Sequence, residues 1–562
     1  MNDSATHEQG VSAPTLLDSR RTYAWLGIFT ATVIWFLLAA GRPLVHPDEG
    51  RYAEIPREML ASGDWVTPHL NGVAYFEKPP LQYWATALAY RVFGISEWSA
   101  RFWTLLSGWL DVVLVFLLAN RIWGPRTAMV AAAMLASSLL HFVMGQLMTL
   151  DMAFTCLTTA TLCAFCMAQL NRDMAPSASR WWMLASWAFL ALATLTKGIA
   201  APLITGSVVA LYVLWQRDWR VLRTLRPVLG PMVFAVIAVP WFVLAARAHP
   251  DFLSFFFVHE HLQRFLTDSA RRVEPWWFFL TILAVGVLPW LPQTASALWR
   301  GWRASAAPGH FDVLRMLWIW CVFVLVFFSA SQSKLAPYVL PIVPMLALLT
   351  AARRAQDDVR ALRISICVLL IGAIALIGYV VFAKSFGAET FVLELVDRVR
   401  PAALAFGVIA IATVAACWRA VRHGRTTFAV LGVAAAWFLG LSMIFATLDH
   451  PALRSGRSLA AQIPASLAAQ APIFSIHTYD QTLPFYLRRT MVLVNTHGEL
   501  DFGLRSAPEM AIADTQRFSE IWQSLPEGIA IMPRESYEQM RDAGLSMRVL
   551  GRDRRRIAVS RR

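Results

Sequence analysis

Long uninterrupted stretches of apolar residues restrict the fold of this sequence more than any other feature. A helix needs about 20 apolar residues to cross the hydrocarbon core of a bilayer. Of the 562 residues, 57% are hydrophobic and only 15% are charged. We therefore expect an α-helical polytopic membrane protein with about 13 transmembrane helices. The predicted spans cover residues 23–40, 101–120, 127–145, 150–169, 181–196, 199–215, 228–246, 276–297, 313–330, 338–352, 361–383, 401–418 and 426–447.

The linkers between these segments alternate between basic and less basic ones. Arginines concentrate in every second linker and just before the first span, and they account for much of the net charge of +14. Because basic loops mark the cytoplasmic side of a membrane, the tail 1–22 is predicted to be cytoplasmic and the transmembrane domain to extend over 23–447. Loop 41–100 and the tail 448–562 then lie outside the cytoplasm. This charge pattern argues against nucleic-acid binding.

The last hundred or so residues differ in composition from the rest of the chain. Polar and apolar residues mix there, and short strand-like runs alternate with helix-like stretches, which predicts a small soluble α/β domain. The runs are APIFSI (471–476), MVLVN (491–495) and GIAIM (528–532). The basic end RDRRRIAVSRR (552–562) is expected to be solvated or to face lipid headgroups.

Loop 41–100 is far longer than a connection between two spans requires. It begins with HPDEGRY (46–52), in which Asp48, Arg51 and Tyr52 have the i, i+3, i+4 spacing of neighbours on a helix. A salt-bridged surface helix would explain this pattern. A second carboxylate, Asp151, opens the span at 150–169, where a charge is costly unless it faces a cavity. Two acids on one membrane face therefore indicate a site.

Basic residues on the same outer side could hold a phosphate. Lys78 precedes two prolines that fix the backbone, and Arg264 ends the stretch HEHLQR. Lysine and arginine bind desolvated phosphates well, although Lys78 could also simply reach the headgroups.

A divalent metal, such as zinc, is a second possibility for this region. His259 and His261 lie on one side of an extended segment, and Glu77 could supply a third ligand. Two histidines without a third ligand fixed by spacing are more often not a metal site. Lys197, Lys334 and Tyr338 lie in other outer loops, where both residue types commonly anchor a protein at the interface.

Several long motifs resemble one family of membrane enzymes. HPDEGRYAEIPREML, GDWVTPHLNGVAYFEKPPLQYW and SKLAPYVLP are similar to those of the bacterial aminoarabinose (4-amino-4-deoxy-L-arabinose) transferases. These belong to the GT-C class of glycosyltransferases and are related to the protein O-mannosyltransferases. The resemblance implies transfer of aminoarabinose from undecaprenyl phosphate to lipid A phosphates on the periplasmic face of the inner membrane, which confers resistance to polymyxin.

The resemblance also implies roles for particular residues. Asp48 and Asp151 would be the catalytic carboxylates, and Lys78 and Arg264 would hold the carrier-lipid phosphate. The cavity would be lined by Arg51, Tyr52, Tyr75 and Tyr338.

The implied reaction calls for no nucleotide, which agrees with a sequence that contains no phosphate-binding loop. No cofactor is assigned beyond the possible divalent metal. A lipid A phosphate is already anionic, so Asp48 would orient the acceptor or pair with the ammonium group of the sugar. A related enzyme acting on protein hydroxyls would instead need Asp48 as a general base. A transporter is disfavoured, because transporters place their polar residues at the bilayer midplane.

Overall fold

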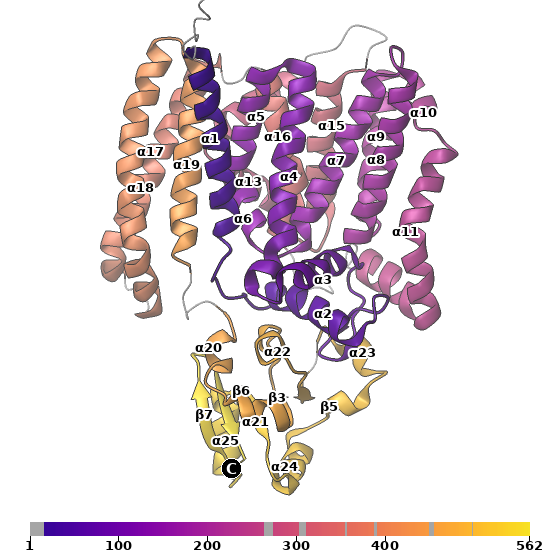
Figure 1. The fold of residues 1–562 in the computed structure, drawn as a ribbon, viewed down its shortest axis with the longest axis vertical. Coiled ribbons are helices and arrows are strands. Elements are labelled where there is room, and N and C mark those ends of the chain that lie inside the picture. Colours follow the sequence, from indigo (N-terminus) through magenta and orange to yellow (C-terminus); the bar gives the residue numbers. More distant parts are fainter. Residues whose placement is uncertain are drawn as a thin grey trace, which may run out of the picture.

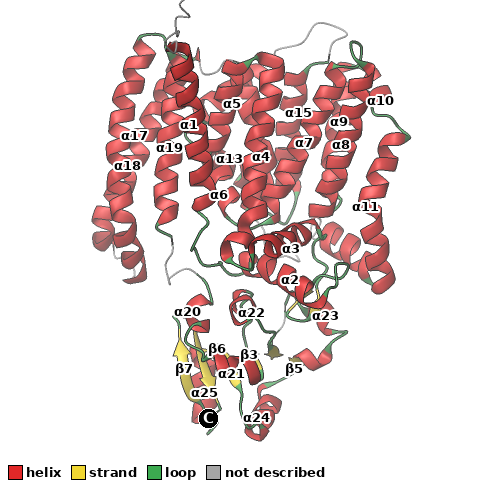
Figure 2. Cartoon of the chain, in the orientation of Figure 1, coloured by secondary structure: helices red, strands yellow, loops and turns green. Residues whose placement is uncertain are grey.

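The computed structural model describes residues 16–263, 274–302, 311–353, 357–386, 390–448, 454–496 and 498–561. It consists of a helical bundle and a smaller C-terminal domain, with helices α2 and α3 between them (Figure 1). The strands gather in the C-terminal domain, whereas the bundle is helical throughout (Figure 2). The predicted fold class is therefore confirmed.

Helices occupy all thirteen predicted apolar segments. Within the described residues, seven helices are long and apolar enough to cross a membrane, or nine if each of two bent pairs is one span. The bundle contains α1 (Leu16–Leu37), α4 (Glu97–Trp123), α5 (Pro125–Ser137), α6 (Leu139–Gln146), α7 (Leu150–Leu170), α8 (Pro176–Lys197), α9 (Ala200–Gln216), α10 (Arg220–Thr224), α11 (Leu229–Ala248), η1 (Ser254–Gln263), α13 (Phe278–Gly286), α14 (Leu291–Gly301), α15 (Val313–Ala330), η2 (Ala336–Ile342), α16 (Val343–Ala352), α17 (Val359–Phe382), η4 (Ala383–Phe386), α18 (Thr390–Arg422) and α19 (Thr426–Ala446).

Two predicted spans are not continuous helices. The segment at 127–145 is the pair α5 and α6, bent by 61°, and the segment at 276–297 is the pair α13 and α14, bent by 119°. Pro289 and Pro292 lie at the second break, where proline removes a backbone donor and clashes with the preceding turn. The length of an apolar segment alone does not reveal such breaks.

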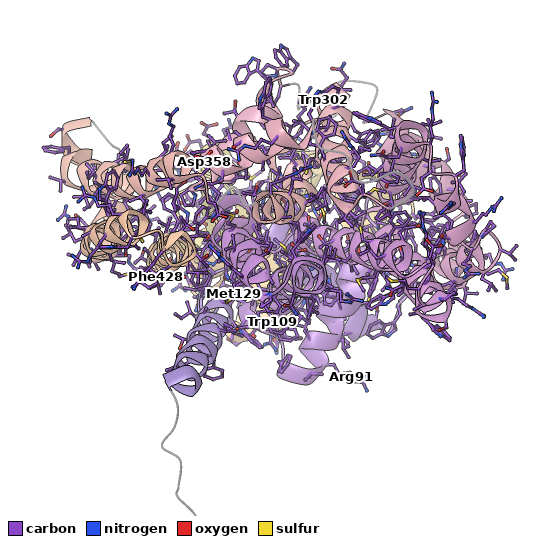
Figure 3. All side chains as sticks on the ribbon, turned by 90° about the horizontal axis from the view of Figure 1, so that it is seen from above. Arg91, Trp109, Met129, Trp302, Asp358 and Phe428 are labelled. Carbon is purple, nitrogen blue, oxygen red and sulfur yellow. The ribbon has the colours of Figure 1, made fainter. Side chains whose placement is uncertain are left out.

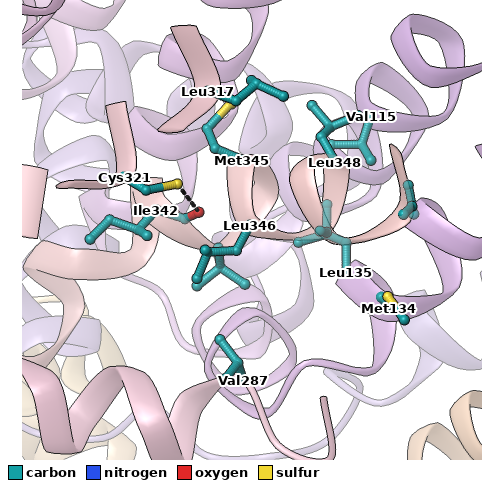
Figure 4. Close-up of a cluster of buried hydrophobic side chains, with 14 of the residues drawn as sticks. Val115, Met134, Leu135, Val287, Leu317, Cys321, Ile342, Met345, Leu346 and Leu348 are labelled. Carbon is teal, nitrogen blue, oxygen red and sulfur yellow. Dashed lines mark hydrogen bonds between the residues drawn. The ribbon is translucent and has the colours of Figure 1, made fainter. Parts of the chain in front are cut away.

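The bundle buries its centre and exposes apolar side chains at its edge. Val115, Leu135, Leu317 and Met345 come from four helices and pack together in the core (Figure 4). Phe428 lies at the periphery in the view from above (Figure 3), where 59% of its surface is exposed. An exposed apolar rim around a packed centre is what a lipid environment requires.

Loop 41–100 folds into two helices and a hairpin. These are α2 (Asp48–Ser62), α3 (Leu81–Phe93), β1 (His69–Leu70) and β2 (Val73–Ala74). The two-residue turn of the hairpin is Asn71-Gly72, and both residues have positive φ, as this tight turn type demands. The predicted helical order after His46 is thus confirmed.

The C-terminal domain is a six-stranded mixed sheet with helices. Its strand order is β5-β4-β3-β6-β8-β7, in which β3 to β6 pair in parallel and β7 and β8 are antiparallel. The elements are β3 (Ile473–Ile476), β4 (Val492–Val494), β5 (Ala511–Ile512), β6 (Ile529–Pro533), β7 (Arg548–Arg552), β8 (Arg556–Ser560), α20 (Arg457–Ala460), α21 (Ala465–Gln470), α22 (Thr482–Leu487), α23 (Asp501–Leu504), η5 (Pro508–Met510), α24 (Thr515–Ser524) and α25 (Arg534–Asp542).

The interpretation of the basic end as a solvated or headgroup-facing tail is wrong. Residues 556–560 form β8, which lies inside the sheet between β6 and β7. Arg556 is only 3% exposed and forms ion pairs with Asp480 and Asp553. These carboxylates neutralise the buried guanidinium, so a charged sequence can occupy an interior strand.

The C-terminal domain packs closely on α2. A Cβ at Gly50 would lie 2.5 Å from the backbone of Gln481 and Thr482, so only glycine permits this approach. The Asn71 side chain donates to Met491 O at 2.7 Å and accepts from Met491 N at 2.8 Å. Loop 41–100 and the tail after α19 therefore lie on the same side of the bundle, as predicted (Figure 1).

A buried ion pair holds the beginning of α2 against the bundle. Both Glu49 oxygens accept from Arg101 of α4, at 2.8 and 2.7 Å, and Glu49 Oε1 also accepts from Met148 N at 3.0 Å. Burial alone would raise the pKa of Glu49, but Arg101, Arg42 and the Met148 amide lower it to about 2. The carboxylate is therefore ionised and fixes α2 to both α4 and the entrance of α7.

We expect Glu49→Gln to lower the unfolding free energy by about 3–5 kcal/mol, because the variant leaves buried Arg101 without its carboxylate. The apparent melting temperature in detergent, followed by tryptophan fluorescence, measures the effect. Since the folded pKa lies below the usual 4.5, this stabilisation is present above pH 4.5 and is lost between pH 4.5 and 2. The difference between wild type and variant should therefore shrink in acid.

The matched control is Glu520→Gln, which removes an exposed ion pair with Arg517 at 2.8 Å. Exposed pairs contribute little to stability, so this variant should melt like the wild type. Equal melting temperatures for Glu49→Gln and the control would contradict the assigned role of Glu49.

Candidate active site

The two predicted carboxylates lie in the first turns of two helices, on the side of the bundle that faces the C-terminal domain. Asp48 is the first residue of α2, and Asp151 lies in the first turn of α7. The bond from Met148 N to Glu49 links these two helix starts. Burial raises the pKa of Tyr52, and the charges of Asp48 and Asp151 raise it further, which places this phenol within the field of both acids.

Arg51 forms the centre of a cluster beside Asp48. Its guanidinium lies 3.3 Å from Asp48 Oδ1 and 5.8 Å from the ring centres of both Tyr52 and Tyr75. It also forms an ion pair with Glu499 of the C-terminal domain. Although burial lowers the pKa of Arg51, Tyr75 and Glu499 raise it well above its usual range, so Arg51 is a permanent cation.

Glu499 is itself held by a second residue of the C-terminal domain. Gln481, which precedes α22, donates a hydrogen bond to Glu499 Oε1. Burial raises the pKa of Glu499, Arg51 and Gln481 oppose that shift, and Glu77 and Asp48 add to it. The C-terminal domain thus supplies one wall of the cluster.

Two tyrosine hydroxyls in the same cluster have no hydrogen-bond partner among the described residues. Tyr75 is 1% exposed and Tyr83 is fully buried, and the hydroxyl oxygen of each is unsatisfied. Their pKa values are raised, chiefly by burial, so both phenols are protonated donors. Unsatisfied buried hydroxyls are costly, and a polar ligand bound here would satisfy them.

Asp151 belongs to a second group of charges. It forms an ion pair with Lys197, the last residue of α8. Lys197 Nζ lies 4.5 Å from the centre of the Tyr338 ring and 5.3 Å from that of Phe154. A cation above aromatic faces, beside a carboxylate, is a strongly oriented group.

Lys78 lies in a third group. Its ammonium is 3.7 Å from Glu260 Oε2 and donates to Glu77 O at 2.9 Å. Glu260 is 6% exposed and lies 3.3 Å from His259 Nδ1. Lys78 is thus placed by a neighbouring carboxylate rather than extended into bulk water.

The structure brings some of the predicted site residues together and leaves others outside the described residues. It brings together Asp48, Arg51, Tyr52 and Tyr75, and it places Asp151 near Tyr338 through Lys197. Arg264 and the side chain of His261 lie outside the described residues.

The predicted metal ligands do not gather in the part of the chain that the structure describes. No three His, Cys, Asp or Glu side chains there could hold a metal ion together. The His259 side chain is 57% exposed and contacts Glu260. Glu77 and His259 alone are too few ligands to hold a metal ion.

The sequence did not predict four residues of these groups as site residues: Tyr83, Lys197, Glu260 and Glu499. Lys197 reads as an interface anchor, and Glu260 lies within HEHLQR between the two histidines that drew attention. Glu499 follows the strand-like run MVLVN, with nothing nearby to connect it to loop 41–100. Only Tyr83 had a usable signal, because it lies in the motif EKPPLQYW.

A polytopic bundle with carboxylates, cations and unsatisfied phenols on the face that carries the C-terminal domain, together with a match to a mannosyltransferase family model, identifies a membrane glycosyltransferase of the GT-C class. Two family models match the chain: dolichyl-phosphate-mannose-protein mannosyltransferase over residues 21–256, and aminoarabinose transferase C-terminal domain over residues 459–561. The chain belongs to the family of undecaprenyl phosphate-α-4-amino-4-deoxy-L-arabinose arabinosyl transferases, as its similarity to known members shows.

The relatives match over most of their length. The arabinosyl transferase of Edwardsiella ictaluri is 32% identical over 88% of this chain and 89% of its own length. That of Pseudomonas paraeruginosa is 32% identical over 92% and 93%. The crystal structure of ArnT from Cupriavidus metallidurans bound to undecaprenyl phosphate superposes with a TM-score of 0.88, at 34% identity, over 96% of this chain and 98% of that one.

We expect Glu499→Gln to reduce kcat/KM for sugar transfer by about 10-fold or more, which corresponds to about 1.4 kcal/mol, because Arg51 loses its carboxylate. If Glu499 acts through Arg51, adding Arg51→Gln should cost less in this background than in the wild type. Initial rates of transfer for the two single variants and the double variant provide the measurement.

Glu538→Gln is the control within the same domain, since it removes an exposed pair with Arg534 at 2.9 Å. It should transfer sugar at the wild-type rate. Strictly additive losses for Arg51 and Glu499 would show that the two side chains act independently and would contradict the coupling.

Proposed function

We propose that this protein transfers 4-amino-4-deoxy-L-arabinose from undecaprenyl phosphate to the phosphate groups of lipid A. The reaction would take place at the periplasmic face of the bacterial inner membrane and confer resistance to polymyxin and other cationic peptides. Family membership supports the donor and the sugar. The observation that carries the proposal is the position of Asp48 and Asp151 at two helix starts that the bond from Met148 N to Glu49 links, with unsatisfied tyrosine hydroxyls beside Arg51 and Tyr52.

In this reaction the bond from the anomeric carbon of the sugar to the carrier phosphate breaks, and its electron pair leaves with undecaprenyl phosphate. An anionic oxygen of the lipid A phosphate forms the new bond to that carbon. Cations stabilise the charge that develops on the departing phosphate, and Lys78 and Arg264 are assigned to this role. Arg51, Tyr52, Tyr75 and Tyr338 are assigned to the lining of the substrate site, where they would orient both partners.

The acceptor oxygen needs no deprotonation, so the carboxylates have another task. The Asp48 side chain is 53% exposed. It can pair with the sugar's ammonium group or orient the acceptor, with Asp151 assisting. A protein hydroxyl as acceptor would require a general base. The C-terminal match to the aminoarabinose transferases favours the lipid acceptor instead.

The ion pairs of the site suit a donor that carries both signs of charge. Arg51 pairs with Glu499, Lys197 with Asp151 and Lys78 with Glu260. When the donor binds, its phosphate can take a cation while its ammonium takes the released carboxylate. Each of these partly buried charges then keeps a partner of opposite sign, whereas a neutral sugar would offer none to the released carboxylate.

Lipid A from a Gram-negative strain that lacks its own transferase but makes the lipid-linked sugar tests the proposal. Mass spectrometry should detect aminopentose on lipid A after complementation with this protein, and at least about 100-fold less with Asp48→Asn or Asp151→Asn at equal membrane levels. Asp542→Asn, at an exposed position paired with Arg541, is the control and should match the wild type. Unmodified lipid A with the folded wild-type protein and donor present would refute the assignment.

A donor analogue with an acetylated amine tests the charge argument separately. Without the ammonium we expect transfer to fall by about 10-fold or more, because a released carboxylate would stay unpaired. Transfer assays with purified protein and both donors measure this ratio. Equal rates would show that the carboxylates do not recognise the amine.

A further inference from the structure

Two buried arginines share one buried carboxylate at the outer end of α1. Arg42 is 4% exposed and Arg101 is fully buried, and the acid near both is Glu49. Arg101 takes both Glu49 oxygens at 2.7 and 2.8 Å, whereas Arg42 Nη2 lies 3.8 Å from Glu49 Oε1 and donates to Gln146 O. The group therefore carries one positive charge in excess.

This excess charge acts on Arg42. Burial and the charge of Arg101 lower its pKa to about 10, although Glu49 opposes the shift. Arg42 remains protonated at neutral pH, and its buried Nε has no hydrogen-bond partner among the described residues. A buried cation with an unused donor calls for an anion.

A groove with apolar walls leads to this arginine. Its volume is about 300 Å³, and Arg42 is the charged residue in its lining. Phe445 near the end of α19 faces the Arg42 guanidinium, 5.7 Å from its ring centre. The other lining residues are Ile34, Leu37, Leu38, Ala40 and Ala446.

The groove lies at the membrane-facing edge of the bundle. Leu37 is 63% exposed and ends α1, while Leu38, just after α1, and Phe445 of α19 pack against one hydrophobic cluster. Exposed apolar side chains around a transmembrane bundle contact acyl chains. A lipid lying there would bring its phosphate to the level of Arg42, just beyond the end of α1.

We propose that this groove binds an anionic phospholipid of the surrounding bilayer, with its phosphate on Arg42 and an acyl chain along α1 and α19. One net negative charge cancels the one excess positive charge, which a zwitterionic lipid cannot do. The site is separate from the transfer reaction, and its occupation does not depend on the function proposed above. Because Glu49 contacts Arg42 and adjoins Asp48, the bound lipid also stabilises the start of α2.

Native mass spectrometry of the full-length protein tests this binding. Phosphatidylglycerol and phosphatidylcholine are titrated at equal concentration into wild type, Arg42→Gln and Leu37→Trp. The second variant fills the groove from an exposed position without changing its charge, so it tests the site even if Arg42→Gln folds poorly. We expect one tightly bound phosphatidylglycerol on the wild type and about 10-fold weaker binding to both variants.

Arg91→Gln is the matched control, because Arg91 is an exposed arginine near the end of α3 on the same outer side. It should bind phosphatidylglycerol like the wild type. Undiminished phosphatidylglycerol binding by Leu37→Trp and by folded Arg42→Gln would overturn the proposal. Equal binding of phosphatidylcholine to the wild type would overturn it too. So would displacement of phosphatidylglycerol by equimolar undecaprenyl phosphate or lipid A in the wild type but not in Leu37→Trp, because the groove would then bind a substrate lipid.

Discussion

The bidentate pair between Glu49 and Arg101 is the interaction on which the half of the protein around α2 and the C-terminal domain depends. Glu49 also accepts hydrogen bonds from Met148 N and Val45 N, both at 3.0 Å, so one buried carboxylate joins the loop after α1, the helix α4 and the entrance of α7. These bonds keep the acid ionised at its depressed pKa of about 2. Asp48 is adjacent to Glu49, and Asp151 begins the helix that follows Met148. One structural carboxylate therefore links the starts of the two helices that carry the proposed catalytic acids.

The C-terminal domain completes the site. Its Glu499 pairs with Arg51, and its Asp480 lies 3.8 Å from His46 Nδ1, at the other end of the stretch that opens loop 41–100. The close contact at Gly50 leaves no room for a side chain between α2 and the residues before α22. Three parts of the chain, the bundle, the outer loop and the C-terminal domain, thus meet around Asp48, and each contributes at least one charged group.

The sequence was sufficient for the features set by local physics and insufficient for those set by long-range contacts. Apolar length located the helices, and the spacing of Asp48, Arg51 and Tyr52 predicted α2. The interior strand β8 was missed because its arginines read as solvated, whereas Asp480 and Asp553 neutralise Arg556. Glu499 was missed because its role depends on an ion pair with Arg51, which lies in another domain. Ion pairs between distant segments leave no periodic signal in a single sequence.

Charge balance connects the stability of the fold with the choice of substrate. At the edge of a membrane an unpaired buried charge is expensive, and the cations Arg51, Lys197 and Lys78 each lie beside a carboxylate. An aminosugar phosphate brings its own cation and allows a complete exchange of partners. The pairing that neutralises these cations therefore also suits a donor with both charges, which is the chemistry of aminoarabinose on a lipid phosphate.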